Sequence, residues 1–382
     1  MSLTFFEFFA GGGMARAGLG DAWNCVFAND NDAKKRASYA ANWGELHLNP
    51  LSVSQLTTAH LPTRADLAWA SFPCQDLSLA GDYTGLKGER SGTFWPFWRL
   101  IEQLVQEDRA PSMIALENVC GALTSHDGKD FAAIGAALAD SGYRFGALVM
   151  DAVHFLPQSR PRLFIVGVQH GLEIPERLVT LRPDPFWHPP NLLTAYENLS
   201  ERSKAACVWW NIPLPPPRTT VFSDFIEDEP EGVRWHTSAE TERLLSLMSA
   251  LNRRKVENAQ RIGRRMIGGI YKRTRPNGRG ERVQRAEIRF DDVAGCLRTP
   301  VGGSSRQLLM IVEGRSIRSR LLSPREAARL MGLADSYKLP ANYNQAYHLV
   351  GDGVAVPVVR HLAQHIIEPL IRSMRAAIEP AA

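Results

Sequence analysis

The sequence predicts an α/β protein in which a mostly parallel, doubly wound sheet is followed by a smaller, loop-rich domain. Six short apolar runs alternate with helix-like stretches as far as about residue 168, which is typical of strands flanked by helices. Prolines then accumulate between residues 183 and 217, at a density that neither a helix interior nor a central strand tolerates. We therefore expect a first domain at residues 1–180, a second at 181–335, and a C-terminal segment at 336–382 that returns to the first.

The elements of the first domain follow from the order of its apolar runs. Helix formers at suitable spacing fill Ala33–Trp43 and Asp130–Ser141. In a doubly wound sheet the carboxyl ends of the strands lie along one edge, where ligands bind. The predicted strands are residues 3–9, 25–29, 67–71, 112–116, 145–150 and 162–168.

Three helices are predicted in the later part of the chain. One begins near Ser238. Ser323, Pro324 and Glu326 form a capping box with proline at the first helical position, and apolar residues at helical spacing run from Val358 to Met374. The first of these helices is expected to bury Leu244, Leu245, Leu247, Met248 and Leu251.

Composition limits the compartment and the class of protein. At 382 residues with 45% hydrophobic residues, the chain can bury a sizeable core. Its five cysteines are widely separated and none has zinc-site spacing, so we expect free thiols, a reducing compartment and no metal. Because the N-terminus lacks signal-peptide features and no apolar run could span a bilayer, we expect a soluble, cytoplasmic protein that makes no membrane contact.

Positive charge is concentrated in one segment. Between Arg253 and Arg289 there are thirteen Lys or Arg against three Glu, although the net charge of the whole chain is only +4. A basic segment on a mildly acidic body is expected where a protein meets a phosphate backbone. A solvated helix face followed by a basic loop is the alternative that charge leaves open.

A glycine turn follows the first predicted strand. Phe9 and Ala10 lead into Gly11, Gly12 and Gly13, where glycine lets the backbone approach a ligand closely. A glycine-rich turn is at least as often a tight turn with no ligand-binding role. However, Asp30 ends the second strand, from where a carboxylate can accept hydrogen bonds from both hydroxyls of a ribose. The two features together indicate an adenosine-containing ligand.

Reactive side chains follow the third and fourth of these strands. Cys74 lies in the loop Ser-Phe-Pro-Cys-Gln, where it could be a nucleophile or a buried, inert thiol. Glu117 and Asn118 follow the next apolar run, and Gln158, Arg160 and Arg162 come at the start of the last predicted strand. Their convergence on one rim is difficult to explain by chance.

The order of these motifs resembles the cytosine-C5 DNA methyltransferases of bacteria and phages. The resemblance covers most of the chain and includes Arg90-Ser-Gly-Thr-Phe, Arg320-Leu-Leu-Ser-Pro-Arg-Glu and Gly351-Asp-Gly-Val. It implies a Rossmann-like methyltransferase domain that uses S-adenosylmethionine, with a smaller target-recognition domain and double-stranded DNA as substrate. A cognate restriction endonuclease is a possible partner, and a monomer is expected.

The resemblance also assigns cofactor contacts. Two departures from the family pattern affect this set: Met14 replaces the last glycine of F-x-G-x-G-G, and Asp352 replaces the asparagine of G-N-x-V. The acidic block that contacts adenine in the family is not identified between Asp30 and Pro73. The expected cofactor residues are Phe9, Ala10, Gly11, Gly12, Gly13, Asp30, Asn31, Pro73, Gly351 and Asp352.

The catalytic roles implied by the resemblance form one mechanism. Cys74 would add to carbon 6 of cytosine, which makes carbon 5 nucleophilic toward a methyl sulfonium. Glu117, protonated and buried, would stabilise the charge that develops at N3. Arg160 and Arg162 would contact the base and its sugar-phosphate, with Arg162 at the carbonyl oxygen, and Asn118 would orient the Pro-Cys loop. The base that removes the C5 proton is not identified.

A cytosine stacked in a duplex cannot reach Cys74, so the target must be flipped out. The segment from Arg298 to Arg306 resembles a groove-reading loop, in which either arginine could contact guanine. A turn between two strands is the alternative. The expected DNA contacts are Gln75, Ser78, Gln158, Arg298, Ser304, Ser305 and Arg306.

Other functions share parts of this pattern. A tRNA cytosine methyltransferase would use the same catalytic residues, and a non-catalytic DNA-binding regulator could keep the fold. A nicotinamide dehydrogenase could share the glycine turn and Asp30, but it would not need the Cys74, Glu117 and Arg162 motifs together.

Overall fold

The structure is a computed structural model, and it describes residues 2–62, 64–73, 93–276, 280–298 and 306–378. The chain forms two compact units. Unit 1 comprises Met1–Asp151, Pro161–Pro216 and Val354–Ala382, and unit 2 comprises Ala152–Arg160 and Pro217–Gly353. The units therefore change over at Pro216 and Gly353, whereas composition placed the boundaries near 181 and 336. Among the described helices, none is both long and apolar enough to cross a membrane.

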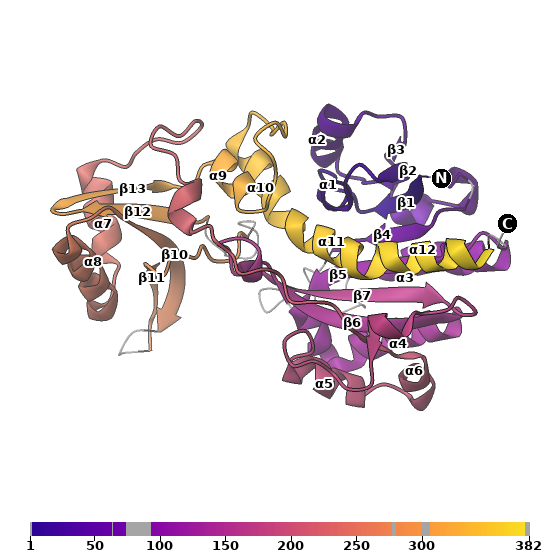
Figure 1. Cartoon of the computed structure of the whole chain (residues 1–382). Coiled ribbons are helices and arrows are strands. Elements are labelled where there is room, and N and C mark those ends of the chain that lie inside the picture. Colours follow the sequence, from indigo (N-terminus) through magenta and orange to yellow (C-terminus); the bar gives the residue numbers. More distant parts are fainter. Residues whose placement is uncertain (1, 63, 74–92, 277–279, 299–305, 379–382) are drawn as a thin grey trace. The chain divides into compact units, whose positions relative to one another are not determined.

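Unit 1 is built on a seven-stranded sheet with the order β3-β2-β1-β4-β5-β7-β6 (Figure 1). Neighbouring strands from β3 to β5 are parallel, and β7 is antiparallel to both β5 and β6. The predicted α/β class and its mostly parallel sheet are confirmed. The strands are β1 (Leu3–Phe8), β2 (Trp23–Asn29), β3 (Leu48–Asn49), β4 (Leu67–Ala70), β5 (Met113–Val119), β6 (Tyr143–Asp151) and β7 (Pro161–Gln169).

Helices pack around this sheet. The helix predicted at 33–43 is present, and the predicted C-terminal helical run is continuous through a π-helical turn at Ala363–Ile367. Gly18 has no room for a side chain because a Cβ there would lie 2.4 Å from Val359. The helices are α1 (Met14–Leu19), α2 (Ala33–Trp43), α3 (Phe94–Gln106), α4 (Lys129–Asp140), α5 (Pro190–Glu197), α6 (Glu201–Ala206), α11 (Val356–Leu362) and α12 (Glu368–Ile378); a small pair of strands, β8 (Val179–Thr180) and β9 (Trp209–Trp210), completes the unit.

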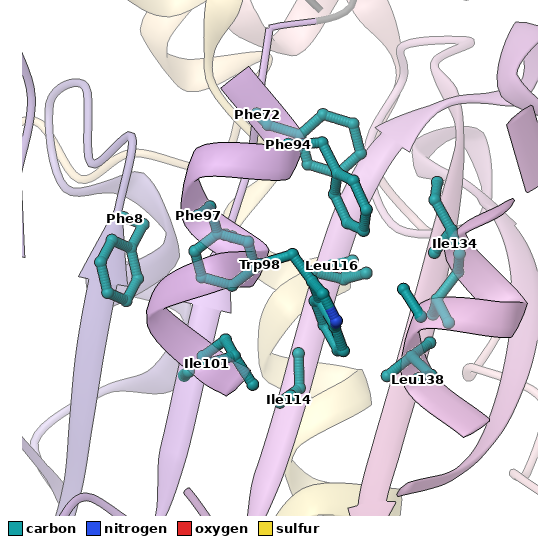
Figure 2. Close-up of a cluster of buried hydrophobic side chains, with 14 of the residues drawn as sticks. Phe8, Phe72, Phe94, Phe97, Trp98, Ile101, Ile114, Leu116, Ile134 and Leu138 are labelled. Atoms are coloured by element: carbon teal, nitrogen blue, oxygen red, sulfur yellow. The ribbon is translucent and has the colours of Figure 1, made fainter. Parts of the chain in front are cut away.

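A large apolar cluster packs between α3 and the sheet (Figure 2). The ring of Phe97 lies 4.9 Å from that of Phe8 on β1, measured between centroids, and Phe94 stacks on Trp98 at 5.7 Å. Phe72, immediately after β4, lies 5.3 Å from Phe94. Because buried aromatic pairs contribute both area and preferred geometry, this cluster holds the ends of β1 and β4 in place.

Unit 2 contains a four-stranded antiparallel sheet with the order β11-β10-β12-β13. The basic segment Arg253–Arg289 covers most of one helix, at Ala250–Ile262, and both strands of the β10–β11 hairpin of this sheet. The strands are β10 (Met266–Pro276), β11 (Arg282–Arg289), β12 (Leu308–Glu313) and β13 (Ser316–Leu321), and the helices are α7 (Ser238–Ser246), α8 (Ala250–Ile262), α9 (Pro324–Arg329) and α10 (Tyr343–Asp352).

The helix predicted from Ser238 is two helices. Leu244 and Met248 are buried as expected, but Leu251 is 60% exposed, so its predicted burial is wrong. The side chain of Ser249 caps α8 by accepting a hydrogen bond from the Asn252 amide, which restarts the helix at Ala250. The apolar residues keep helical spacing across this break, which is why a single helix was predicted.

The predicted capping box of α9 is confirmed and belongs to a buried ion pair. Glu326 Oε2 accepts a hydrogen bond from the Ser323 amide at 2.7 Å, and Ser323 Oγ accepts one from the Glu326 amide at 3.1 Å. Both carboxylate oxygens of Glu326 also contact the Arg320 guanidinium, and both side chains are 0% exposed. The capping residue thus also neutralises a buried arginine.

Candidate active site

The register of the unit 1 sheet brings the predicted site residues to one edge. Phe8, at the end of β1, pairs with Asn29 on β2 and with Ala70 on β4, and Ala70 pairs with Leu116 on β5. The residues that follow these four positions therefore emerge side by side, since parallel strands end at the same edge. They are Phe9 with the glycine turn, Asp30, Ser71 and Glu117.

The glycine turn and Asp30 are in direct contact. The Gly11 amide donates a hydrogen bond to Asp30 Oδ2 at 2.9 Å, and Asp30 Oδ1 accepts one from the Asp32 amide at 2.8 Å. Gly11 has φ +56°, and a Cβ placed on it would meet no atom within 4 Å. The turn thus leaves open space beside a buried carboxylate, and burial raises the pKa of Asp30. This arrangement suits the ribose and backbone contacts of a nucleoside cofactor.

Trp43, at the end of α2, closes the rear of the turn. Its indole Nε1 donates to the Gly12 carbonyl at 3.0 Å, and a Cβ on Gly13 would lie 2.3 Å from the same nitrogen. Gly13 also has φ +75° and is the N-cap of α1, so Met14 is the first helical residue and is buried. The family's missing final glycine therefore falls on a helical position, which does not require glycine. Trp43 was not predicted as a site residue, although it ends a predicted helix.

Glu7 is a buried acid close to this turn, and it is not among the predicted site residues. The Arg16 amide donates to its Oε1 at 3.2 Å, and the Arg16 guanidinium lies 4.9 Å from the centre of the Trp43 ring. Burial raises the pKa of Glu7 to about 7, an effect that the contacts with Arg16 only partly offset. An acidic residue within an otherwise apolar strand, Leu-Thr-Phe-Phe-Glu-Phe, is the signal that could have identified it.

The chain immediately before Cys74 is anchored at two points. Besides the ring contact with Phe94, the Phe72 carbonyl accepts a hydrogen bond from Asn118 Nδ2 at 3.4 Å. Asn118 Oδ1 in turn accepts from the Val119 amide at 2.8 Å. Asn118 thus contacts the segment that the resemblance led us to expect it to orient.

Glu117 and Arg162 form an ion pair at this edge. Arg162 Nε lies 3.3 Å from Glu117 Oε1, and Glu117 is 7% exposed. The pairing depends on strand direction: because β7 is antiparallel to β5, Val119 at the end of β5 lies opposite Arg162 at the start of β7. Two predicted catalytic residues, 45 positions apart in the chain, therefore share one contact.

Arg160 and Gln158 have different surroundings from Arg162. Arg160 is 2% exposed, and its guanidinium donates to the carbonyls of Leu297, Gly351 and Gly353 at 2.7–2.9 Å. Gln158 is 0% exposed, and its amide group binds the Leu330 carbonyl and the Leu297 amide. Gly351 lies in α10 and contributes its carbonyl to Arg160.

The remaining predicted residues fall into two groups. Asn31, Pro73, Asp352 and Arg298 are described and exposed. Arg306 is half-buried; its guanidinium donates a hydrogen bond to Asn344 Oδ1 and lies over the ring of Tyr343. The other predicted positions lie outside the described residues; they are Cys74, Gln75, Ser78, Ser304 and Ser305.

The unit 1 fold and its edge define a class of protein: a Rossmann-like α/β protein whose sheet edge carries a glycine turn and a buried aspartate together with a paired glutamate and arginine. A family model for the C-5 cytosine-specific DNA methylase matches residues 3–368. The chain therefore belongs to the C-5 cytosine-specific DNA methylase family.

Individual relatives agree with this family. The chain is 26% identical over 387 aligned residues to the type II methyltransferase M.HpaII of Haemophilus parainfluenzae, covering 96% of this chain and 90% of the relative. It is 24% identical over 369 residues to the type II methyltransferase M.HhaI of Haemophilus parahaemolyticus, covering 95% and 94%. Among solved structures, the methyltransferase EhMeth of Entamoeba histolytica aligns with a TM-score of 0.65 at 13% identity, covering 97% and 99%, which shows the fold.

Family membership confirms the central sequence prediction. The chain is an enzyme, a DNA (cytosine-5)-methyltransferase, and its methyl donor is S-adenosylmethionine. The dehydrogenase alternative is wrong, and the family favours DNA over tRNA and an active enzyme over a regulator. Family membership does not by itself assign a role to each site residue.

Proposed function

We propose that the enzyme methylates a cytosine flipped out of a specific duplex sequence, with Cys74 as its covalent nucleophile. The observation that carries this proposal is the common edge of the unit 1 sheet. There, Phe72 is anchored immediately before the Pro-Cys loop by Asn118, and the strand that bears Asn118 also bears Glu117, paired with Arg162. A base held at this edge could meet a nucleophile, an acid and an arginine together.

The cofactor fits the other half of the same edge. When bound, S-adenosylmethionine supplies an electrophilic methyl group on a sulfonium. We propose that Asp30 accepts hydrogen bonds from the ribose hydroxyls of the cofactor. Gly11, which faces open space, would let the cofactor approach the backbone. Phe9, Ala10, Gly12, Gly13, Asn31 and Pro73 would line this side, and Gly351 and Asp352 stay predicted contacts.

Cys74 would add its thiolate to carbon 6 of the flipped cytosine, so that the electron pair of the C5–C6 double bond becomes available at carbon 5. Carbon 5 would then take the methyl group, with cleavage of the methyl–sulfur bond and loss of the neutral thioether S-adenosylhomocysteine. After a base removes the proton from carbon 5, the C6–S bond breaks, the double bond re-forms and Cys74 leaves as a thiolate.

Glu117 and Arg162 would exchange partners during this sequence. Arg162 lies 3.3 Å from Glu117, so Glu117 would reach N3 of the base only when its contact with Arg162 gives way to contacts with the base. The carbonyl oxygen of cytosine is the acceptor that Arg162 would take instead. Binding of the base would thereby free Glu117 from Arg162 to act at N3.

A basic ribbon in unit 2 supports duplex DNA as the substrate. Strand β10 pairs with β12 only as far as Ile270, whereas its pairing with β11 continues to Pro276, so the end of the hairpin extends beyond the sheet. Arg273 lies directly opposite Arg285 there, and Arg273 and Arg275 share the single carboxylate of Glu287. Opposed like charges cost stability in a hairpin, and a phosphate backbone would relieve this repulsion.

Recognition of the base sequence would depend on a separate set of residues. We propose Arg298, which is exposed, and Arg306 as base contacts, with Ser304 and Ser305 between them and with Gln75 and Ser78 beside the catalytic cysteine. A bidentate arginine contact to guanine is the commonest specific contact in the major groove.

We propose a cytoplasmic monomer, which light scattering would test against the chain mass of 42.4 kDa. The relatives named above are type II methyltransferases, so a cognate endonuclease that cuts the unmethylated form of the same sequence is a proposed partner.

The decisive experiment is transfer of a labelled methyl group to duplex DNA and, separately, to tRNA. The wild type, Cys74→Ala and the matched control Cys207→Ala would be compared, and bisulfite sequencing would map the labelled cytosines. We expect DNA labelling by the wild type and by Cys207→Ala, within one defined sequence, and none by Cys74→Ala.

A second substrate tests the covalent step directly. With 5-fluorocytosine at the mapped position, no proton is available for removal from carbon 5, so the bond to Cys74 should persist. A protein–DNA adduct that survives denaturation is expected for the wild type and not for Cys74→Ala. Full activity of Cys74→Ala, or labelling of tRNA alone, would overturn the proposal.

A further inference from the structure

The segment that contains Gln158 and Arg160 is paired with the chain that leads to Arg298. The Ser159 amide donates to the Ala294 carbonyl at 2.9 Å, and the Ala294 amide donates to the Pro157 carbonyl at 2.7 Å. These bonds form an isolated parallel bridge between Gln158 and Ala294. The two segments are therefore held side by side by their backbones, although more than 130 residues separate them in the chain.

Side chains continue this pairing where the backbone contacts end. Gln158 Oε1 accepts a hydrogen bond from the Leu297 amide at 3.2 Å, and Arg160 Nη1 donates to the Leu297 carbonyl at 2.9 Å. The backbone N–H and C=O of Leu297 thus both bind side chains, and the two residues that supply those side chains lie two positions apart in the chain. Leu297 is 1% exposed, so neither group could turn to water without rearrangement.

Other amide and guanidinium nitrogens of the two side chains also donate hydrogen bonds to backbone carbonyls. Gln158 Nε2 donates to the Leu330 carbonyl at 2.6 Å, and Arg160 Nη2 donates to the carbonyls of Gly351 and Gly353 at 2.8 and 2.7 Å. A guanidinium that donates to three carbonyls and is 2% exposed has little capacity for a phosphate or a base. Arg162, which follows two residues later, is instead paired with Glu117.

We propose that Gln158 and Arg160 are positioning residues that fix the backbone of Leu297 and thereby the position of Arg298, which follows it and is a proposed base contact. Within the same motif, only Arg162 would act at the target base. This inference rests on the proposed function, because it assigns sequence selection to Arg298. It replaces the DNA contact expected of Gln158 and the base contact expected of Arg160.

The test separates selection from chemistry. Gln158→Met keeps the length of the side chain but removes its hydrogen bonds, and Arg160→Lys keeps the charge but cannot span three carbonyls. The exposed Gln103 on α3 provides the matched control Gln103→Met. For each variant, kcat/KM is measured on the mapped sequence and on sequences that differ from it by one base pair.

We expect the ratio of these kcat/KM values to fall about ten-fold in Gln158→Met and Arg160→Lys, the order of one base-pair preference. Arg162→Lys should instead lower kcat on all sequences alike and keep the ratio. The ratio does not depend on the fraction of folded enzyme, because both values scale with active enzyme, so a partly unfolded variant remains informative.

Salt dependence supplies an independent readout. An arginine or lysine that neutralises a phosphate contributes about 0.9 to the slope of log K against log salt. We expect Arg160→Gln, which removes the charge, to keep the wild-type slope.

A ratio within two-fold of the wild type in both variants would overturn the positioning role, as would an equal loss of kcat on every sequence. If the wild type itself methylates no defined DNA sequence, the proposed function fails first, and this outcome is recognised before any variant is compared.

Discussion

Each unit contains an arginine–glutamate pair, and the two pairs differ in every respect that separates function from stability. In unit 2, Arg320 and Glu326 are 0% exposed and make two contacts, and the carboxylate also accepts the Ser323 amide and, at 2.8 Å, the Glu227 amide. In unit 1, Arg162 and Glu117 share one contact of 3.3 Å at an edge of the sheet. The first pair is bidentate and fully enclosed, whereas the second lies at the sheet edge where the proposed substrate would bind.

This difference indicates which pair the chain needs in order to fold and which it needs in order to react. A buried carboxylate whose oxygens are fully used stabilises one conformation, and its removal leaves an unpaired buried arginine. A carboxylate at a strand end, beside the anchored Phe72, has contacts that a base could replace. Variants of three glutamates, Glu117, Glu326 and Glu7, test this difference.

The largest effect is expected for Glu117→Gln. Because the amide cannot donate a carboxylic proton toward N3, kcat for DNA methylation should fall by about 10²- to 10⁴-fold. The midpoint of urea unfolding should change little, since the amide keeps an oxygen for Arg162. Activity within ten-fold of the wild type would remove Glu117 from the chemistry, and a large shift of the midpoint would make it a structural residue.

Glu326→Gln should have the opposite signature. The loss of a charge partner for the buried Arg320 should lower the free energy of unfolding by about 3–5 kcal/mol, measured by urea denaturation. Asp140→Asn is the control, because it breaks the exposed pair between Arg202 and Asp140 and should cost far less. If both changes cost the same, burial would not be what distinguishes the pairs.

Glu7 is intermediate, because only part of its carboxylate is used: among the described residues, Oε2 has no hydrogen-bond partner. Its pKa rises from 4.5 to about 7 in the fold, so between these values the folded chain holds a proton that the unfolded chain has released. The contribution of Glu7 to stability therefore falls as pH rises through this window, by about 3 kcal/mol in total.

Glu7→Gln should remove this dependence. The difference in unfolding free energy between variant and wild type should shift in favour of the variant from pH 4.5 to 7 and stay constant above that range. The exposed Glu102 on α3 provides the control Glu102→Gln, which should run parallel to the wild type. A parallel curve for Glu7→Gln would mean that its carboxyl titrates normally in the fold.

Much of unit 1 could be predicted from residues close together in the chain. The apolar runs predicted the strands because a strand buried on both faces needs continuous apolar sequence. The break between α7 and α8 was missed because the apolar spacing continues through it, while the Ser249 cap is a local signal that the periodicity obscured. The strands of the basic stretch were missed because their outward faces carry arginine, so that charge masks their alternation.

The class of fold, the glycine turn with Asp30 and the family could all be inferred from the amino-acid sequence. These features depend on local patterns and on motifs in a fixed order, which can be recognised without knowing any tertiary contact. The antiparallel direction of β7 against β5, which brings Arg162 to Glu117, became known only from the folded chain. So did the burial of Arg160, one residue of the same motif, against the carbonyls of Leu297 and Gly351. The physical reason is that strand direction and the burial of a long polar side chain depend on partners far away in the chain, which no local pattern specifies.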